Sequence, residues 1–191
     1  MAAAFPYLRD DLARYHLGPR PLSLSVALRA IWPQPGFQAV AAYRFGRALG
    51  LRRRQLAWWP LALSLYPLFW MLQTWVRLAY DIHLDQNADI GPGLYVGHFG
   101  GIRLEACRIG RHCAVQQQVR AHPAADADGG PVIGDNVWIG AHATIIGPIR
   151  IGEQSTIGAG AVVTADVAPR CLVMGDPARV IRWDFDNSSF L

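Results

Sequence analysis

The sequence contains no lysine, and all 18 of its basic side chains are arginines. Only 17% of the residues are charged, and the formal net charge is +4 at pH 7. Arginine binds phosphate bidentately, but a surplus of four charges is small for a nucleic-acid-binding protein. No helix-turn-helix pattern occurs, and no run of basic and aromatic residues follows position 80. The sequence therefore predicts no nucleic-acid partner, and we attribute the lack of lysine to compositional bias.

Cysteine is also scarce. The chain has three cysteines, an odd number, and no pair of them has the C-x-x-C spacing. This pattern argues against a disulfide framework and against a zinc knuckle. The N-terminal segment MAAAFPYLRDDLARYHLG lacks the apolar core of a signal peptide. We therefore expect a cytoplasmic protein, and its 52% hydrophobic composition predicts a substantial folded core.

The segment before position 81 has the pattern of a helical region. Apolar residues cluster at helical spacing over residues 22–32 and again over residues 36–54. The sequence PQPG, residues 33–36, separates the two segments and is a strong helix breaker. We expect two helices here, and we assign residues 1–80 to an N-terminal helical region that associates with a membrane or with other subunits.

A charge-free stretch, from Gln55 to Val76, lies near the end of this region. A membrane span needs about 20 apolar residues, but Pro60 and Pro67 would each remove a helical hydrogen bond. We therefore favour two other interpretations over a span. In one, the segment lies in a membrane interface, with its four tryptophans at headgroup level and residues 52–54, all arginine, on anionic lipid. In the other, it is a buried helix that packs against other subunits.

After residue 80 an aliphatic residue recurs at every sixth position. The series is interrupted by one extra residue before Ile109 and by one long loop, RAHPAADADGGP, at residues 120–131. Glycine often follows the aliphatic residue. The members of the series are Leu84, Ile90, Val96, Ile102, Ile109, Val115, Ile133, Ile139, Ile145, Ile151, Ile157 and Val163.

A six-residue period fits neither an α-helix nor an alternating strand, but it is the signature of a hexapeptide β-helix. Each hexapeptide forms one flat side of a triangular coil, with its aliphatic residue inside. The corners require small residues or residues that tolerate positive φ, which indicates glycine, asparagine or aspartate. The predicted fold is therefore mainly β, a parallel β-helix over residues 81–181 with a projecting loop at 120–131 and a C-terminal tail over 182–191.

Stacking of the coils defines a candidate site. Two positions after the inward residue on one side, successive coils contain His98, Gln117, Ala141 and Ala159, provided that the loop does not change the order of the sides. Alanines at this position would let a slender molecule lie against the backbone and bond to its amides. The column thus predicts a cleft for an extended thioester cofactor with His98 at the reactive end. The alternative is that small residues merely suit the turn.

The coil region resembles the left-handed β-helix acyltransferases, in particular the serine O-acetyltransferases and their exopolysaccharide-associated relatives. The resemblance runs from about Leu22 to Ile181. It implies a left-handed β-helix, a homotrimer, acetyl-CoA as donor and His98 as general base, and it implies that Ala141 and Ala159 contact the pantetheine arm. It rests on the motifs PGFQAVAAYRFGRAL, IGPGLYVGHFGGI, VIGDNVWIGAHATIIGPIRIGEQSTIGAGAVV and VMGDPARVI.

Imidazole suits the role that the resemblance implies. Its unperturbed pKa of about 6.5 lets it accept a hydroxyl proton near neutral pH. The acidic partner of the histidine would fall, without gaps, at His83, and Asp81 and Asp85 lie two residues to either side. In an extended segment both would point the same way as His83. Either aspartate could orient the imidazole.

Three departures from the family pattern concern the acceptor. Serine-specific members carry an acidic residue where this chain has Gly97, and an Arg-His pair where it has Gly129 and Gly130. Because those groups would bind serine, the sequence favours a sugar hydroxyl of a surface polysaccharide or its lipid-linked precursor, contacted by Gln117 and His122. Serine O-acetylation and a non-catalytic trimeric scaffold of a glycan assembly complex are the alternatives.

The remaining coil histidines indicate no metal site. His112 and His142 each follow an aliphatic residue by three positions, but on different sides of the coil, so they would not converge on one ion. We expect no metal. If residues 55–76 bind lipid, the expected location becomes peripheral, at the inner face of the cytoplasmic membrane.

Overall fold

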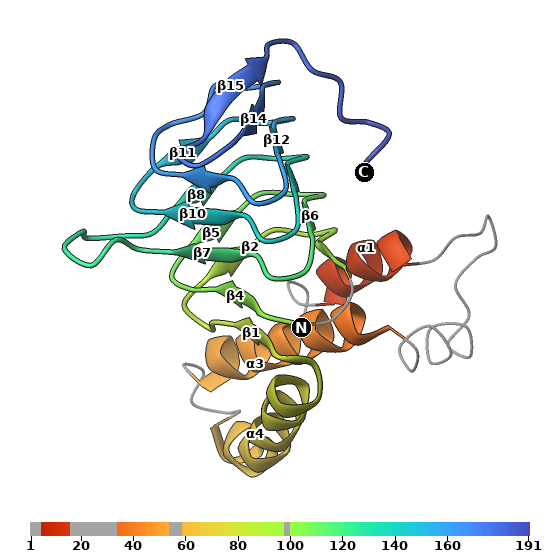
Figure 1. Ribbon diagram of the computed structural model, residues 1–191. Helices are drawn as coiled ribbons and strands as arrows, with labels where there is room; N and C mark the ends of the chain where they lie inside the picture. The colour runs from red at the N-terminus through yellow and green to blue at the C-terminus, as the bar shows by residue number, and fades with distance from the viewer. Residues whose placement is uncertain (1–4, 16–33, 54–58, 98–99) are drawn as a thin grey trace.

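The structure, a computed structural model, describes residues 5–15, 34–53, 59–97 and 100–191. Two predicted features lie outside these ranges, namely the helix over residues 22–32 and the candidate base His98. Figure 1 shows the arrangement of the described parts, with helices at one end of a tall stack of strands.

Three helices are described: α1 (Phe5–Tyr15), α3 (Pro35–Arg53) and α4 (Trp59–Tyr80). The predicted helix over residues 36–54 is confirmed as α3, which begins one residue earlier because proline is tolerated in the first turn of a helix. Helix α4 covers most of the charge-free stretch and continues through Pro67. Within the described ranges, no helix is both long enough and apolar enough to cross a bilayer.

The strands form a triangular solenoid, which confirms the predicted left-handed parallel β-helix. Every strand pair is parallel except β14 with β15. Sheet A contains β1 (Ile82–Leu84), β4 (Ile102–Leu104), β7 (Arg120–His122), β10 (Thr144–Ile146) and β13 (Val162–Val163). Sheet B contains β2 (Asp89–Ile90), β5 (Arg108–Ile109), β8 (Val132–Ile133) and β11 (Arg150–Ile151). Sheet C contains β3 (Tyr95–Val96), β6 (Ala114–Val115), β9 (Trp138–Ile139), β12 (Thr156–Ile157), β14 (Leu172–Met174) and β15 (Arg179–Arg182).

The aliphatic column fills the solenoid. Every member of the hexapeptide series is buried, and none is more than 3% exposed. In sheet C, for example, Val96 lies opposite Val115, and Ile139 lies opposite Ile157. Burying one such side chain contributes about 1.5–3 kcal/mol, so the repeat itself supplies the main driving force for folding.

The corners of the coils differ from the prediction. Positive φ values occur at residues such as His112, His142 and Arg170, so the expectation of glycine, asparagine or aspartate is wrong in part. The left-handed conformation costs a non-glycine residue about 1–2 kcal/mol. The corner amides offset this cost by bonding to the neighbouring coil, as His142 N does to the Gln117 carbonyl (2.9 Å) and Gln154 N to the Asp135 carbonyl (2.8 Å).

Helix α3 closes the N-terminal end of the solenoid. Val40 and Tyr43 are fully buried and belong to the same apolar cluster as the coil residues, and the Tyr43 hydroxyl donates to the Ala88 carbonyl (2.7 Å). Helix α1 is attached by a buried ion pair between Arg44 Nε and Asp11 Oδ2 (2.8 Å). Helices α3 and α4 therefore share the core of the solenoid, whereas α1 packs against α3 in a separate cluster of Leu12, Tyr15 and Phe37.

The C-terminal tail returns along the outside of the solenoid (Figure 1). Phe190 packs against Trp138, with ring centroids 5.2 Å apart, and Asn187 Nδ2 donates to the Asn136 carbonyl (2.8 Å). At its end, the Leu191 carbonyl accepts a hydrogen bond from the Arg14 guanidinium (2.6 Å). The tail thus links the last coils to α1.

The three cysteines, Cys107, Cys113 and Cys171, are buried and unpaired. Burial raises the pKa of Cys107 and of Cys113 to about 12. Because the thiolate is the nucleophilic form, neither thiol is suited to covalent catalysis at neutral pH.

Candidate functional site

The predicted column exists as far as the structure describes it. Gln117, Ala141 and Ala159 each lie two residues after one of the sheet C residues Val115, Ile139 and Ile157, which are aligned in successive strands. The corners are joined by hydrogen bonds from His142 N to the Gln117 carbonyl (2.9 Å) and from Gly160 N to the Ala141 carbonyl (2.8 Å). The projecting loop therefore leaves the order of the sides unchanged, as the column required.

Beyond Gln117, the surface of this column consists of backbone and the methyl groups of Ala141 and Ala159. Ala159 is exposed and Ala141 is half-buried. A Cβ atom on Gly140 would lie 2.6 Å from Ala159 N, so the two coils approach too closely there for any side chain. Such a surface offers room and amide groups to a thin, extended ligand.

The residues just before position 98 are held in place by helices α1 and α3. The Tyr15 hydroxyl of α1 accepts a hydrogen bond from Val96 N (2.6 Å) and donates one to the Val96 carbonyl (3.3 Å). A Cβ on Gly36 of α3 would overlap the same carbonyl oxygen, so only glycine fits at that position. Neither residue was singled out from the sequence, because contacts between residues so far apart leave no local pattern.

The residues just after position 99 lie beside the C-terminal end of α4. Gly100 N donates to the Tyr80 carbonyl (3.0 Å), and Ile102 N donates to the Asp81 carbonyl (3.2 Å). Asp81 has a φ of 50°, so the expectation of an extended segment in which Asp81 points with His83 is wrong. Asp85 Oδ1 accepts a hydrogen bond from Asn87 N (3.0 Å) and so caps a local turn. Asp81 is therefore the aspartate whose backbone is bonded to the described chain that follows residue 99.

The projecting segment is shorter than predicted. Residues 120–122 form β7, so the loop begins at Pro123. Ala121 points into the core, which places Arg120 and His122 on the outer side of the strand. His122 Nδ1 lies 2.7 Å from the Pro123 carbonyl oxygen. Since a carbonyl only accepts, Nδ1 carries the proton, and Nε2 is the nitrogen left for other partners.

The three glycines that depart from the family pattern differ in their surroundings. Gly129 has a φ of 105°, and a Cβ on Gly130 would overlap the Ala106 carbonyl oxygen. A Cβ on Gly97 would lie 2.7 Å from Gln116 Oε1, at the end of a flexible side chain. The backbone at residues 129–130 thus follows a path that excludes an Arg-His pair, so the two positions are not sites from which charges have simply been removed.

Among the described residues, no group of three or more His, Cys, Asp or Glu side chains is placed to hold a metal ion. His112 and His142 occupy exposed corners on different sides of the coil.

Comparison with known proteins places these features in a family. The family model "Bacterial transferase hexapeptide (six repeats)" matches residues 130–165. A soybean serine acetyltransferase structure is 32% identical with a TM-score of 0.72, and the alignment covers 95% of this chain and 70% of that one. This chain belongs to the hexapeptide-repeat acyltransferases, among the homologues of serine acetyltransferases. The assignment agrees with the resemblance seen in the sequence.

Two further relatives of this acyltransferase have names that state a substrate or a bound ligand. Serine acetyltransferase from Synechococcus elongatus is 33% identical over 150 residues, which are 77% of this chain and 57% of the relative. A solved complex of serine acetyltransferase with CoA has a TM-score of 0.72 at 26% identity and covers 94% of this chain and 70% of that one. The chain spans between 42% and 64% of the length of the curated relatives it matches.

These relatives correct the predicted acceptor. The sequence favoured a sugar of a surface polysaccharide, whereas the matched proteins are serine acetyltransferases. The prediction rested on three glycines, Gly97, Gly129 and Gly130. It assumed that charged side chains could contact serine only from these three positions. The backbone at residues 129–130 suits glycine alone, so glycine at these two positions does not by itself argue against serine.

Proposed function

We propose that this protein is a serine O-acetyltransferase, which transfers the acetyl group of acetyl-CoA to the hydroxyl of L-serine. The observation that carries the proposal is the likeness to soybean serine acetyltransferase over 95% of this chain, helical region included. The column of Gln117, Ala141 and Ala159 supports it independently, because a narrow backbone surface suits a pantetheine arm.

In the proposed reaction His98 is the general base. The imidazole accepts the hydroxyl proton of serine while the serine oxygen attacks the thioester carbonyl carbon. The oxyanion of the tetrahedral intermediate requires hydrogen-bond donors, which backbone N–H groups supply in sites of this kind. The carbon–sulfur bond then breaks, the proton passes to the departing sulfur, and the products are O-acetylserine and CoA.

Asp81 is the proposed partner of His98, in preference to Asp85. The Asp81 carbonyl accepts a hydrogen bond from Ile102 N (3.2 Å), so Asp81 lies next to the chain that leaves residue 99. Asp85 already accepts a hydrogen bond within its own turn. A carboxylate beside the imidazole would fix its orientation and stabilise the imidazolium that forms.

Arg120 is the proposed contact for the serine carboxylate, and His122 is the proposed contact for the serine ammonium group. Both point outward from β7, at the start of the projecting loop, and Arg120 is exposed. A guanidinium binds a carboxylate through two parallel hydrogen bonds, and the unprotonated His122 Nε2 would accept a hydrogen bond from the serine ammonium group. Gln117, half-buried at the head of the described column, is the proposed contact for the substrate nearest the base.

A homotrimer is part of the same proposal. An outer surface of backbone and small side chains covers only one side of a bound pantetheine arm, and a neighbouring subunit would supply the other side. The size of the assembly can be measured by sedimentation equilibrium.

The proposed activity can be tested by measuring CoA release with a thiol reagent in the presence of acetyl-CoA and L-serine. We expect release that depends on serine and yields O-acetylserine by mass spectrometry. L-Alanine, which has no hydroxyl, serves as the control. Release that is equal with serine and alanine would contradict the proposal. Arg120→Ala should raise KM for serine at least tenfold and leave KM for acetyl-CoA unchanged.

A further inference from the structure

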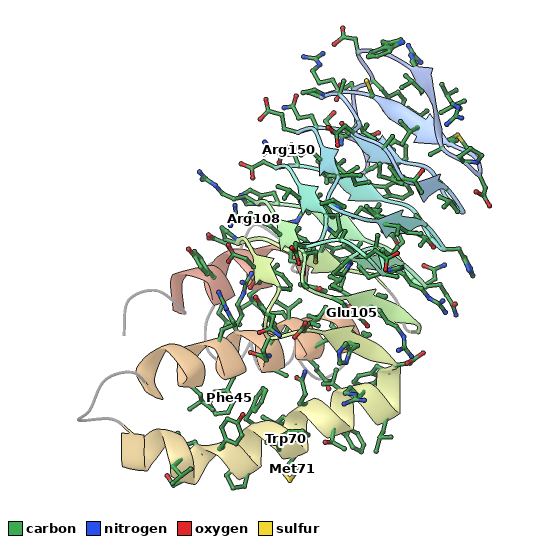
Figure 2. The ribbon with its side chains drawn as sticks, turned by 90° about the vertical axis from the view of Figure 1, so that its left-hand side faces the viewer. Phe45, Trp70, Met71, Glu105, Arg108 and Arg150 are labelled. Carbon is green, nitrogen blue, oxygen red and sulfur yellow. The ribbon has the colours of Figure 1, made fainter. Side chains whose placement is uncertain are left out.

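One side of α4 is apolar and uncovered. Large apolar side chains are 55–83% exposed there, and Figure 2 shows Trp70 and Met71 on the side of the helix that is turned away from α3. The opposite side of α4 is buried through Phe69 and Val76. The most exposed members of this surface, the α4 face, are Leu63, Trp70, Met71, Trp75 and Leu78.

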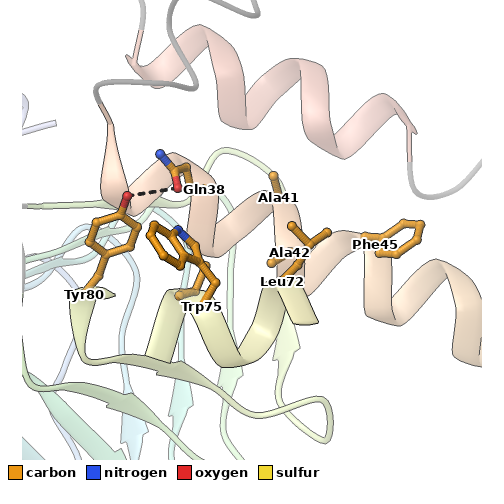
Figure 3. Close-up of a pocket in the computed structure, with 8 residues that line it drawn as sticks. Gln38, Ala41, Ala42, Phe45, Leu72, Trp75 and Tyr80 are labelled. Atoms are coloured by element: carbon orange, nitrogen blue, oxygen red, sulfur yellow. Dashed lines mark hydrogen bonds between the residues drawn. The ribbon is translucent and has the colours of Figure 1, made fainter. Parts of the chain in front are cut away.

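An apolar pocket of about 540 Å³ lies between α3 and α4, next to this face. Phe45, Leu72 and Trp75 line it, and at one end the Tyr80 hydroxyl donates to Gln38 Oε1 (3.1 Å), as Figure 3 shows. Because Trp75 belongs to both surfaces, the pocket extends the α4 face inward. Hydrocarbon that covers the face would find further apolar area there.

The segment that contains α3 and α4, residues 12–80, carries charge of one sign. Residues 12–80 contain nine arginines and no acidic residue, whereas the rest of the chain has nine arginines and 14 acidic residues. The two parts therefore carry +9 and −5, which add to the net charge of +4. Residues 52–54, all arginine, precede α4 in the sequence, and the exposed Arg77 follows Trp70 by seven positions, on the same side of the helix.

We propose that the α4 face lies on the surface of an anionic lipid bilayer. Tryptophan has an amphipathic ring that prefers the headgroup level, and the exposed Arg77 would contact lipid phosphates. An apolar face flanked by positive charge is typical of interfacial helices that lie in the membrane plane. A second copy of this chain is a poorer partner, because it would bring two arginine-rich, acid-free segments together. This inference does not depend on the proposed reaction.

The test uses the full chain and two kinds of lipid vesicle in a flotation gradient. One kind is phosphatidylcholine alone, and the other is a two-to-one mixture of phosphatidylcholine and the anionic lipid phosphatidylglycerol. We expect the protein to float with the anionic vesicles and to remain at the bottom with the neutral ones. Raising the salt from about 0.1 M to 1 M should weaken binding several-fold, since it shortens the Debye length from about 10 to 3 Å.

Trp70→Glu should reduce binding to anionic vesicles at least tenfold. Trp183→Glu is the matched control, because Trp183 is 66% exposed but follows β15 at the opposite end of the solenoid. The control variant should bind as the unchanged protein does. The proposal fails if the unchanged protein does not float, or if the two variants bind equally well. It also fails if sedimentation shows that Trp70→Glu halves the size of the assembly, because a second copy then covers the face.

Discussion

The Tyr15 hydroxyl bonds to both backbone groups of Val96, as acceptor from its N–H at 2.6 Å and as donor to its carbonyl at 3.3 Å. Strand β3, which contains Val96, is an edge strand of sheet C. The N–H and carbonyl groups of Val96 point away from β6, its only neighbour in the sheet. Unpaired edge groups that are buried are costly, and one hydroxyl satisfies both of them. A residue of α1 thereby fixes the strand that leads directly to His98.

Tyr15→Phe should lower the free energy of unfolding by about 1–3 kcal/mol, because it leaves two buried backbone groups unpaired. Urea denaturation followed by circular dichroism measures the change. Tyr66→Phe is the control, since the Tyr66 side chain is 41% exposed on α4. Equal stability of the two variants would show that the hydroxyl of Tyr15 makes no net contribution.

Asp11→Asn should destabilise the protein by about 3–5 kcal/mol, because it leaves the Arg44 guanidinium buried without its counter-charge. Asp11 is fully buried and also accepts hydrogen bonds from Gly93 N (2.8 Å) and Leu94 N (3.0 Å). The control is Asp184→Asn, which breaks an exposed pair with Arg170 and should cost less than about 1 kcal/mol. Similar losses in the two variants would contradict the argument.

His98→Ala should lower kcat for serine acetylation by about 10²–10⁴-fold and leave the affinity for CoA largely unchanged. The reason is that the base acts on the acceptor hydroxyl and not on the nucleotide part of the donor. His112→Ala, at an exposed corner on another side of the coil, should retain normal turnover. Steady-state kinetics measures kcat, and calorimetry measures the affinity for CoA. Near-normal turnover of His98→Ala would show that this residue is not the general base.

Ala159→Trp should abolish CoA binding without unfolding the protein, because an indole would cover the narrow surface of the column. Ala165→Trp adds the same bulk at another exposed position and should bind CoA normally. Calorimetry gives the affinities, and thermal melting shows that both variants are folded. Unchanged affinity in folded Ala159→Trp would place the donor elsewhere.

Alkaline pH should destabilise the protein. Burial raises the pKa of Cys107 and of Cys113 to about 12, from about 8.5 in an unfolded chain. Between these two values the unfolded state has lost the thiol protons that the folded state keeps, so stability falls as pH rises. Burial also raises the pKa of Tyr15 and of Tyr43, which acts in the same direction.

Urea midpoints at pH 8, 9.5 and 11 measure this alkaline loss. The double variant Cys107→Ala/Cys113→Ala should show a smaller decrease than the unchanged protein, because two of the responsible groups are gone. An identical pH dependence in both proteins would mean that the buried thiols contribute nothing to it.

The sequence alone determined the solenoid. A hexapeptide period is a local property, and the buried series from Leu84 to Val163 can be read directly from it. Once the period is known, the column through Gln117, Ala141 and Ala159 follows by counting, and the register of sheet C agrees with that count. The helix α3 was predicted for the same reason, since its apolar spacing is local.

Only the tertiary structure decided which residues contact the described chain on either side of residues 98–99. Tyr15 and Val96 are 81 positions apart, and no periodicity connects them. The choice of Asp81 over Asp85 depends on a left-handed φ and on a turn, both of which are set by packing at the end of α4. The acceptor was predicted wrongly because missing side chains say nothing about the groups that replace them. A repeat fixes what lies inside each coil, whereas the partners on its outside depend on how distant parts of the chain pack against it.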